Sequence, residues 1–246
     1  MDDDELLGTL HRAASAVGTA LDGLADWGPS GTRAGQYRSD LVADEAAIAV
    51  LDAAGLGVMS EESGTQGGDR EVVVVLDPVD GSTNAAHGIP WFATSLCAVD
   101  ADGARAAVVV NQANGDRYEA TRGGGARKNG DAIQPSGCRA LGESVVAFSG
   151  YPPRHLGWSQ FRVLGAAALE LCCVADGVLD GYAVTGGSRL GSWDYLGAML
   201  VCLEAGADVA ELDGAPLVTV EHADRRRPVA AATSELLHAF RSVLSK

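Results

Sequence analysis

The segment Leu76-Asp77-Pro78-Val79-Asp80-Gly81-Ser82-Thr83-Asn84 places two carboxylates three residues apart, at the end of the apolar run Glu71 to Leu76. That run is short and rich in valine, which predicts a strand buried on both faces. We expect both carboxylates to follow the end of this strand, where irregular backbone lets them turn toward one point. Pro78 stiffens the turn by fixing φ, and Gly81 permits a close approach that a side chain would block.

The same segment carries groups suited to binding a phosphate. Ser82 and Thr83 add hydroxyls and backbone amides where a helix can begin, and amides at a helix start bind anions. Carboxylates beside such amides indicate a hard cation that bridges them to the phosphate. Mg²⁺ fits, because it prefers oxygen ligands and often shares them with a substrate phosphate. The alternative interpretation is that Asp-Pro and Asp-Gly are simply turn-forming pairs.

Two distant features add further acidic groups. Ser60-Glu61-Glu62-Ser63 precedes the predicted strand, and Ser192-Trp193-Asp194 opens a predicted helix much later in the chain. Paired glutamates usually face solvent, and an aspartate near a helix start usually caps the helix. Each feature is therefore weak evidence when it is taken alone.

Taken together, these motifs are similar in order and approximate spacing to those of a known family. Glu61-Glu62, the Asp77 to Asn84 segment, and Trp193-Asp194 followed by Glu204-Ala205-Gly206 resemble the signatures of the inositol monophosphatase family. The resemblance covers essentially the whole chain. It implies an α/β fold, a layered αβαβα sandwich of the inositol monophosphatase and fructose-1,6-bisphosphatase type. It also implies one unit over 1–246, with approximate halves 1–140 and 141–246, that usually forms a homodimer.

The resemblance also implies the chemistry, which is Mg²⁺-dependent hydrolysis of a small phosphate monoester by an activated water. Two or three Mg²⁺ ions are expected per site, with Mn²⁺ as an alternative ion and Li⁺ as an inhibitor. Residues matching Asp44 and Ser82 orient and deprotonate the water, and Glu61 joins them as a catalytic residue. The implied metal ligands are Glu61, Asp77, Asp80, Asp194 and the backbone carbonyl of Val79. The implied substrate-binding residues are Gly81, Ser82, Gly165, Ala166, Arg189 and Asp194.

The substrate itself is left open by one departure from the family pattern. Members that act on inositol phosphate carry an acidic residue seven positions before the residue matching Asp194, where this chain has Gly187. Nearby Arg189 could receive a second anionic group through its planar guanidinium, or the loop could fold outward and leave Arg189 in solvent. We therefore expect myo-inositol monophosphate not to be the best substrate. Histidinol phosphate, sugar bisphosphates and nucleotide 3′-phosphates are alternatives, and a non-catalytic metal-binding relative is a distant one.

Composition limits the other classes of function. The chain carries 33 Asp and Glu against 18 Lys and Arg, a formal charge of −15, which disfavours partners such as nucleic acid or an anionic membrane. Its only basic run, Arg225-Arg226-Arg227, is interpreted as a solvated loop. No apolar run approaches the roughly 20 residues that cross a bilayer, and Asp2-Asp3-Asp4 is unlike a secretory signal. The five cysteines lack metal-binding spacing, so we expect reduced thiols in a cytoplasmic protein.

Hydrophobic periodicity and turn residues predict a mixture of helices and strands through both halves, which favours a layered α/β protein. The predicted helices cover 6–24, 40–54, 165–175, 192–205 and the region from 234 onward. The predicted strands and extended segments cover 71–76, 93–99, 106–110, 117–120, 145–148, 178–184, 209–212, 217–220 and 229–232.

Overall fold

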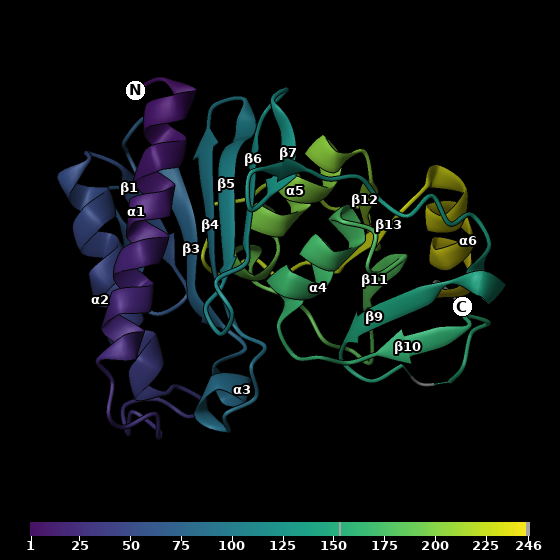
Figure 1. Ribbon diagram of the computed structural model, residues 1–246, viewed down its shortest axis with the longest axis horizontal. Helices are drawn as coiled ribbons and strands as arrows, with labels where there is room; N and C mark the ends of the chain where they lie inside the picture. The colour runs from purple at the N-terminus through teal and green to yellow at the C-terminus, as the bar shows by residue number, and fades with distance from the viewer. Residues whose placement is uncertain (153, 245–246) are drawn as a thin grey trace.

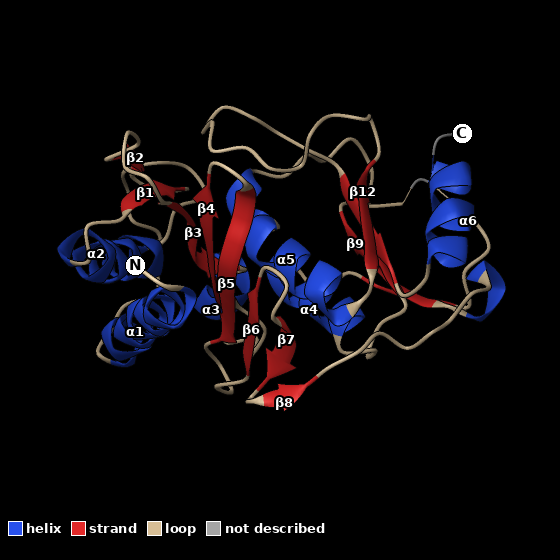
Figure 2. Ribbon diagram, turned by 90° about the horizontal axis from the view of Figure 1, so that it is seen from above, coloured by secondary structure: helices blue, strands red, loops and turns tan. Residues whose placement is uncertain are grey.

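The computed structural model describes residues 1–152 and 154–244, and in this part of the chain the elements form five layers (Figure 1). Helices α1 (Asp3–Asp22) and α2 (Arg38–Ala53) cover the outer face of a large sheet. Helices α4 (Ala167–Ala175) and α5 (Leu196–Ala205) lie between the large sheet and a smaller one, and α6 (Ser234–Leu244) covers the far side of the smaller sheet (Figure 2). The predicted αβαβα sandwich is confirmed.

Within the described residues the large sheet has eight strands in the order β2-β1-β3-β4-β5-β6-β7-β8, antiparallel except for the β1–β3 pair. The small sheet has the order β10-β9-β11-β13-β12, with β9 parallel to β10 and β11. The strand bounds are β1 Gly57–Ser60, β2 Gly64–Gln66, β3 Val73–Asp80, β4 Ala93–Asp100, β5 Gly103–Asn111, β6 Arg117–Thr121, β7 Gly125–Lys128, β8 Asp131–Ala132, β9 Val145–Ser149, β10 Gln160–Arg162, β11 Gly181–Val184, β12 Asp208–Glu211 and β13 Pro228–Ala231.

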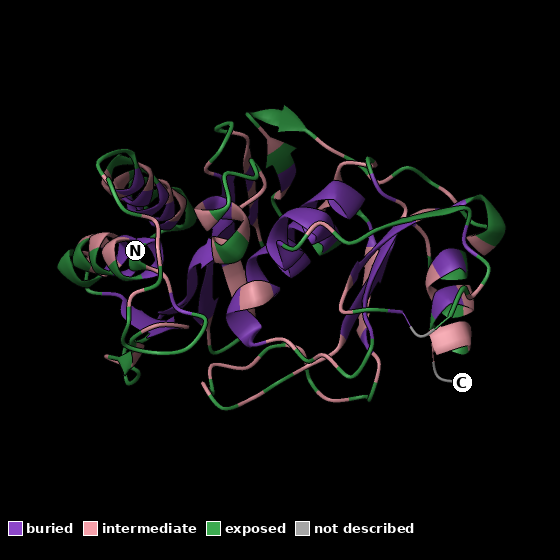
Figure 3. Ribbon diagram, turned by 90° about the horizontal axis from the view of Figure 1, so that it is seen from below, coloured by how far each residue is buried: buried purple, intermediate pink, exposed green. Residues whose placement is uncertain are grey.

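Hydrophobic patterning explains where each helix lies. The apolar stripe of α1 is fully buried at Leu6, Leu10 and Val17, and it packs with α2 on one face of the large sheet. In contrast, every residue of α4 is buried (Figure 3), because sheets cover it on both sides. A helix that is apolar on nearly every side, with Glu170 as its one charged residue, belongs in such a middle layer.

The element predictions hold with local exceptions. The strand predicted over 71–76 runs from Val73 through Asp80, so its end was placed too early. The helix predicted over 192–205 is broken at Tyr195, whose φ of −134° separates the 3₁₀ turn η2 (Ser192–Asp194) from α5. The stretch 217–220 forms no strand, because its polar groups bond to the side chains of Tyr195 and Asp224 and not to a neighbouring strand. The sequence prediction missed β1, β2, β7, β8 and β10, which are short and weakly patterned.

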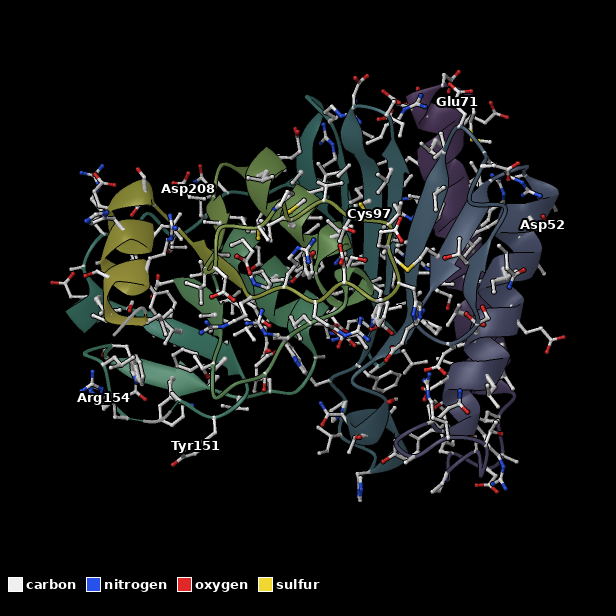
Figure 4. The ribbon with its side chains drawn as sticks, turned by 180° about the vertical axis from the view of Figure 1, so that it is seen from behind. Asp52, Glu71, Cys97, Tyr151, Arg154 and Asp208 are labelled. Atoms are coloured by element: carbon white, nitrogen blue, oxygen red, sulfur yellow. The ribbon has the colours of Figure 1, made fainter. Side chains whose placement is uncertain are left out.

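Three further observations concern the cysteines, the small-sheet end of the molecule and the hydrophobicity of the helices. All five cysteine thiols are free, and Cys97 lies within the large sheet (Figure 4). Tyr151 and Arg154 lie at the end of the molecule that carries the small sheet (Figure 4). Among the helices of 1–152 and 154–244, none is long and apolar enough to cross a membrane.

Candidate active site

A bulge in β3 creates the site. Asp77 pairs with Ser95 of β4 and Asp80 pairs with Ala93, so two residues of β3 lie opposite Thr94 alone. In a regular strand, residues three apart point to opposite faces. The extra residue of a bulge reverses that alternation, and both aspartates then reach the same side. The expectation that they leave the strand end is therefore corrected, because they lie inside β3.

Asp194 completes a compact carboxylate cluster. Oxygens of Asp77, Asp80 and Asp194 all lie within 4.8 Å of one another, although Asp194 comes from η2 in the second half of the chain. Asp77 is 1% exposed and Asp80 is 8% exposed. No Lys or Arg forms an ion pair with these three carboxylates in the described part of the chain. Such a set of oxygen ligands, two buried and one half-buried, fits a hard divalent cation.

The pKa shifts of the clustered acidic groups also favour a bound cation. Burial, followed by the charge of Asp194, raises the pKa of Glu61 to about 8. Burial also raises the pKa of Asp80 to about 8 and, together with the charge of Asp80, the pKa of Asp194 to about 7. The pKa of Asp77 is raised by burial and by the charge of Glu61. Four acidic groups that disfavour each other's ionisation need a cation to hold them as carboxylates.

Backbone amides fix the orientation of each carboxylate. Asp77 Oδ1 accepts from the Val79 amide at 3.0 Å, and Asp194 Oδ2 accepts from the Gly191 amide at 2.8 Å. Asp80 accepts from the amides of Ala167 and Ala168 at the start of α4, at 3.2 and 2.7 Å. Asp80 therefore ties the bulge of the large sheet to the middle layer. The role of the Val79 carbonyl as a ligand stays a prediction.

The turn after Asp80 brings the two predicted substrate-binding segments into contact. Gly81 has φ +86° and begins the short helix α3 (Ser82–Ala86). A Cβ at Gly81 would lie 3.0 Å from the Gly165 carbonyl oxygen and 3.1 Å from the Ala166 Cβ. Asn84 Nδ2 strengthens this junction by donating to the carbonyl of Leu164 at 2.8 Å.

Replacing Gly81 by Ala tests this junction. The change should lower the melting temperature more than Gly88→Ala does, because both glycines have positive φ but only Gly81 is crowded. The left-handed conformation costs about 1–2 kcal/mol in each variant, and Gly81→Ala adds the displacement of Gly165 and Ala166. Thermal unfolding of the two variants measures the difference. Equal decreases in melting temperature would show that the close approach of Gly165 and Ala166 to Gly81 does not affect stability.

Asp44 and Ser82 have different surroundings. Asp44, on α2, accepts a hydrogen bond from the hydroxyl of Ser60 at the end of β1, and burial raises its pKa. No hydrogen bond joins Asp44 to Ser82 in the described residues. Ser82 instead faces an open hollow. The joint action of Asp44 and Ser82 on a water therefore stays a prediction.

The hollow measures about 290 Å³ and draws its walls from both halves of the chain. Arg33 closes one side, where its Nη2 lies 2.8 Å from Glu62 Oε2. The sequence had left Asp40, His222 and Arg225 without a role here, and Arg225 was interpreted as part of a solvated loop. The hollow is lined by Arg33, Ala34, Gly35, Asp40, Glu61, Glu62, Ser82, Trp193, His222 and Arg225.

Arg189 does not line this hollow. Its Nη1 lies 3.0 Å from Asp213 Oδ2, and half of its side chain is exposed. Gly187, two residues earlier, is exposed, and a Cβ at this position would meet no atom within 4 Å. The loop is therefore exposed at this point, and the role of Arg189 in substrate binding stays a prediction.

Comparison with known proteins agrees with this geometry. Residues 36–245 match the model of the inositol monophosphatase family. The chain belongs to the inositol monophosphatase family. It is 36% identical over 204 residues to a fructose-1,6-bisphosphatase/inositol-1-monophosphatase of Archaeoglobus fulgidus, covering 81% of this chain and 79% of that protein. It is also 33% identical to the Nus factor SuhB of Escherichia coli K12, covering 64% and 63% of the two chains.

Solved structures of the inositol monophosphatase family show the same fold over the whole chain. A hypothetical protein from Pyrococcus horikoshii with similarities to inositol-1 monophosphatase superimposes with a TM-score of 0.84 and 25% identity. The match covers 99% of this chain and 98% of that one. The layered fold is therefore shared by the two proteins over nearly their full lengths.

Proposed function

We propose that this inositol monophosphatase family member is a Mg²⁺-dependent phosphatase of a small phosphate monoester. The observation that carries the proposal is the cluster of Asp77, Asp80 and Asp194, whose neighbours in sequence, Ser82 and Trp193, line the hollow. Glu61, these three aspartates and the Val79 carbonyl would hold two or three Mg²⁺ ions. When bound, such ions acidify water, neutralise phosphoryl oxygens and stabilise the leaving alkoxide.

The chain's own groups would position the ester. The first turn of a helix leaves amides without intrahelical partners, so the amides of Gly81 and Ser82 can bind the phosphoryl oxygens. The Ser82 hydroxyl would orient the attacking water, with Asp44 as the group that accepts its proton. Gly165, Ala166 and Asp194 lie on the side of the leaving alcohol. The products are inorganic phosphate and that alcohol.

Replacement of Ser82 by Ala tests the water-orienting role. We expect kcat to fall by about 10–100-fold with a smaller change in KM, because an interaction made mainly in the transition state is lost. Gly81 is the N-cap of α3 and no side-chain cap hydrogen bond forms there, so Ser82→Ala should change the melting temperature little, and an unchanged kcat would contradict the water-orienting role. Steady-state kinetics and a melting curve of the same preparation separate the two outcomes, and Ser82→Thr should keep most of the turnover.

A phosphate-release assay with and without Mg²⁺ tests the proposal as a whole. The panel comprises inositol phosphates, histidinol phosphate, sugar mono- and bisphosphates and nucleotide 3′-phosphates. Release from none of them would favour the non-catalytic alternative. Inhibition by Li⁺, activity with Mn²⁺, a homodimer and a cytoplasmic location stay predictions, the dimer being measured by light scattering coupled to size exclusion.

A further inference from the structure

A long loop of the small-sheet half extends to the metal-binding half. It covers 212–227 between β12 and β13, and its yellow-green trace runs from the small sheet toward the large one (Figure 4). His222 Nε2 donates to the carbonyl of Glu61 at 3.3 Å, across 161 positions of sequence. The loop therefore forms one wall of the hollow that contains the predicted metal ligand Glu61.

Several hydrogen bonds hold this loop in place. Tyr195, at the break between η2 and α5, donates its hydroxyl to the Leu217 carbonyl at 2.6 Å. Thr219 Oγ1 donates to Asp224 Oδ2 at 2.7 Å, and the backbone of Arg226 pairs with Leu190 in both directions at 2.9 Å. The loop thus has a defined path from both of its ends, and the side chains near its tip have defined positions.

Trp193 provides the surface on which the loop tip rests. The His222 ring stacks on the Trp193 ring with centroids 4.8 Å apart and an interplanar angle of 35°. The Arg225 guanidinium carbon lies 4.8 Å from the Trp193 ring centroid, which is a cation–π contact. Because Trp193 directly precedes Asp194, this contact holds a positive charge close to the carboxylate cluster.

Arg225 forms no close ion pair, although its positive charge acts at a distance on the carboxylates of Asp194 and Asp224. Its Nη1 donates to the carbonyls of His222 and Asp224, each at 2.8 Å, and no ion pair with it occurs in the described part of the chain. The other arginine of the hollow, Arg33, is paired with Glu62. In a chain of net charge −15, an exposed guanidinium without a close ion pair at the mouth of a hollow is available to an anion.

Resting on the proposed phosphatase function, we propose that Arg225 determines specificity by binding a second anionic group on the alcohol part of the substrate. The aspartate cluster and the Gly81–Ser82 turn bind the scissile phosphate. Arg225, in the wall formed by the 212–227 loop, binds the second anion. A planar guanidinium binds phosphate or carboxylate through two parallel hydrogen bonds. The favoured substrate class is a sugar bisphosphate or a phosphorylated hydroxy acid, in place of a neutral polyol phosphate.

The test compares three esters in the Mg²⁺-loaded protein: fructose 1,6-bisphosphate, 3-phosphoglycerate and glycerol 2-phosphate. Arg225→Ala should lower kcat/KM for the first or second ester by about 10–100-fold, mainly through KM, because a charged hydrogen bond is lost. It should change the value for glycerol 2-phosphate by less than about threefold. The ester with the larger loss identifies phosphate or carboxylate as the second anion. Arg225→Lys should recover only part of the loss, because it keeps the charge without the fork.

Two further variants test whether the effect on kcat/KM is specific to Arg225. Arg139→Ala removes an exposed arginine whose nearest carboxylate, on Glu235, is 3.9 Å away, and it should change none of the three values. Arg189→Ala tests the rival position. Selective loss with Arg189→Ala and none with Arg225→Ala would overturn the assignment, as would an equal loss on all three esters with Arg225→Ala.

A binding measurement without metal separates this inference from the proposed function. Fructose 6-phosphate keeps the second phosphate and lacks the scissile one, so its affinity in the presence of EDTA reports the Arg225 wall alone. Titration calorimetry should show affinity about tenfold or more weaker in Arg225→Ala. Phosphate release from no ester by the unaltered protein would refute the phosphatase, whereas release from all three with unchanged selectivity in Arg225→Ala would refute only the role of Arg225.

Discussion

Asp77→Asn and Asp194→Asn are each expected to lower phosphatase turnover by about 10²–10³-fold or more, because each removes a charge at the place where transition-state charge develops. The fold should survive, since asparagine has the same shape and the Val79 and Gly191 amides still have an oxygen to donate to. The metal-free variants should even melt at a higher temperature, because one member of a mutually repelling cluster is neutral.

Asp52→Asn is the matched control for this pair. Asp52 lies on the outer surface of α2 (Figure 4), is 66% exposed and pairs with Arg70, so turnover should not change. The measurement is phosphate release at low and saturating Mg²⁺ together with thermal unfolding in EDTA. Near-normal turnover of Asp77→Asn at low Mg²⁺ would refute the metal site.

The second large effect is a fall in stability of the metal-free protein as the pH rises. The folded-state pKa values of Glu61 and Asp80 are about 8 and that of Asp194 is about 7, all raised by burial and mutual repulsion. Between about pH 4 and pH 8 the folded chain therefore holds protons that the unfolded chain has released. Stability then decreases with rising pH through this window, the opposite of the usual salt-bridged carboxylate.

The melting temperature in EDTA should fall by at least about 5 °C between pH 5 and pH 8, since each kcal/mol lost costs a chain of this size about 2–4 °C. Saturating Mg²⁺ should raise the melting temperature most at pH 8, because binding to the folded state alone stabilises it and the ligands must be ionised. Calorimetry at several pH values checks both trends. A melting temperature that rises with pH in EDTA would contradict the raised pKa values.

Local sequence patterns predicted most helices and strands, but they missed the features that depend on pairing between strands. The stripe of α1 and the valine run of β3 are strong signals, so those elements were found. The bulge at Asp77 to Asp80 was missed because the apolar run stops at Leu76 and is followed by an aspartate and a proline, which look like a turn. Pairing with β4 keeps Pro78 inside β3 as part of the bulge. Thr94 Oγ1 of β4 donates to the Pro78 carbonyl at 2.9 Å.

The sequence by itself determined the membership of the carboxylate cluster. Asp77 and Asp80 stand in one short motif that can be read without coordinates, whereas Asp194 joined them through the resemblance of the whole chain to the family pattern. The short motif also predicted a close approach at Gly81, where Gly165 and Ala166 leave no space for a side chain.

Only the tertiary structure decided what surrounds that cluster. Arg225 sits in a basic run that looks solvated, while Arg189 lies nearer to Asp194 in sequence and looked the better partner for an anion. The fold places them differently, because Asp213 pairs with Arg189 while the loop that carries Arg225 rests on Trp193 and contacts Glu61. A contact between residues 161 positions apart depends on how two sheets and the helices between them pack, and no local pattern encodes that distance.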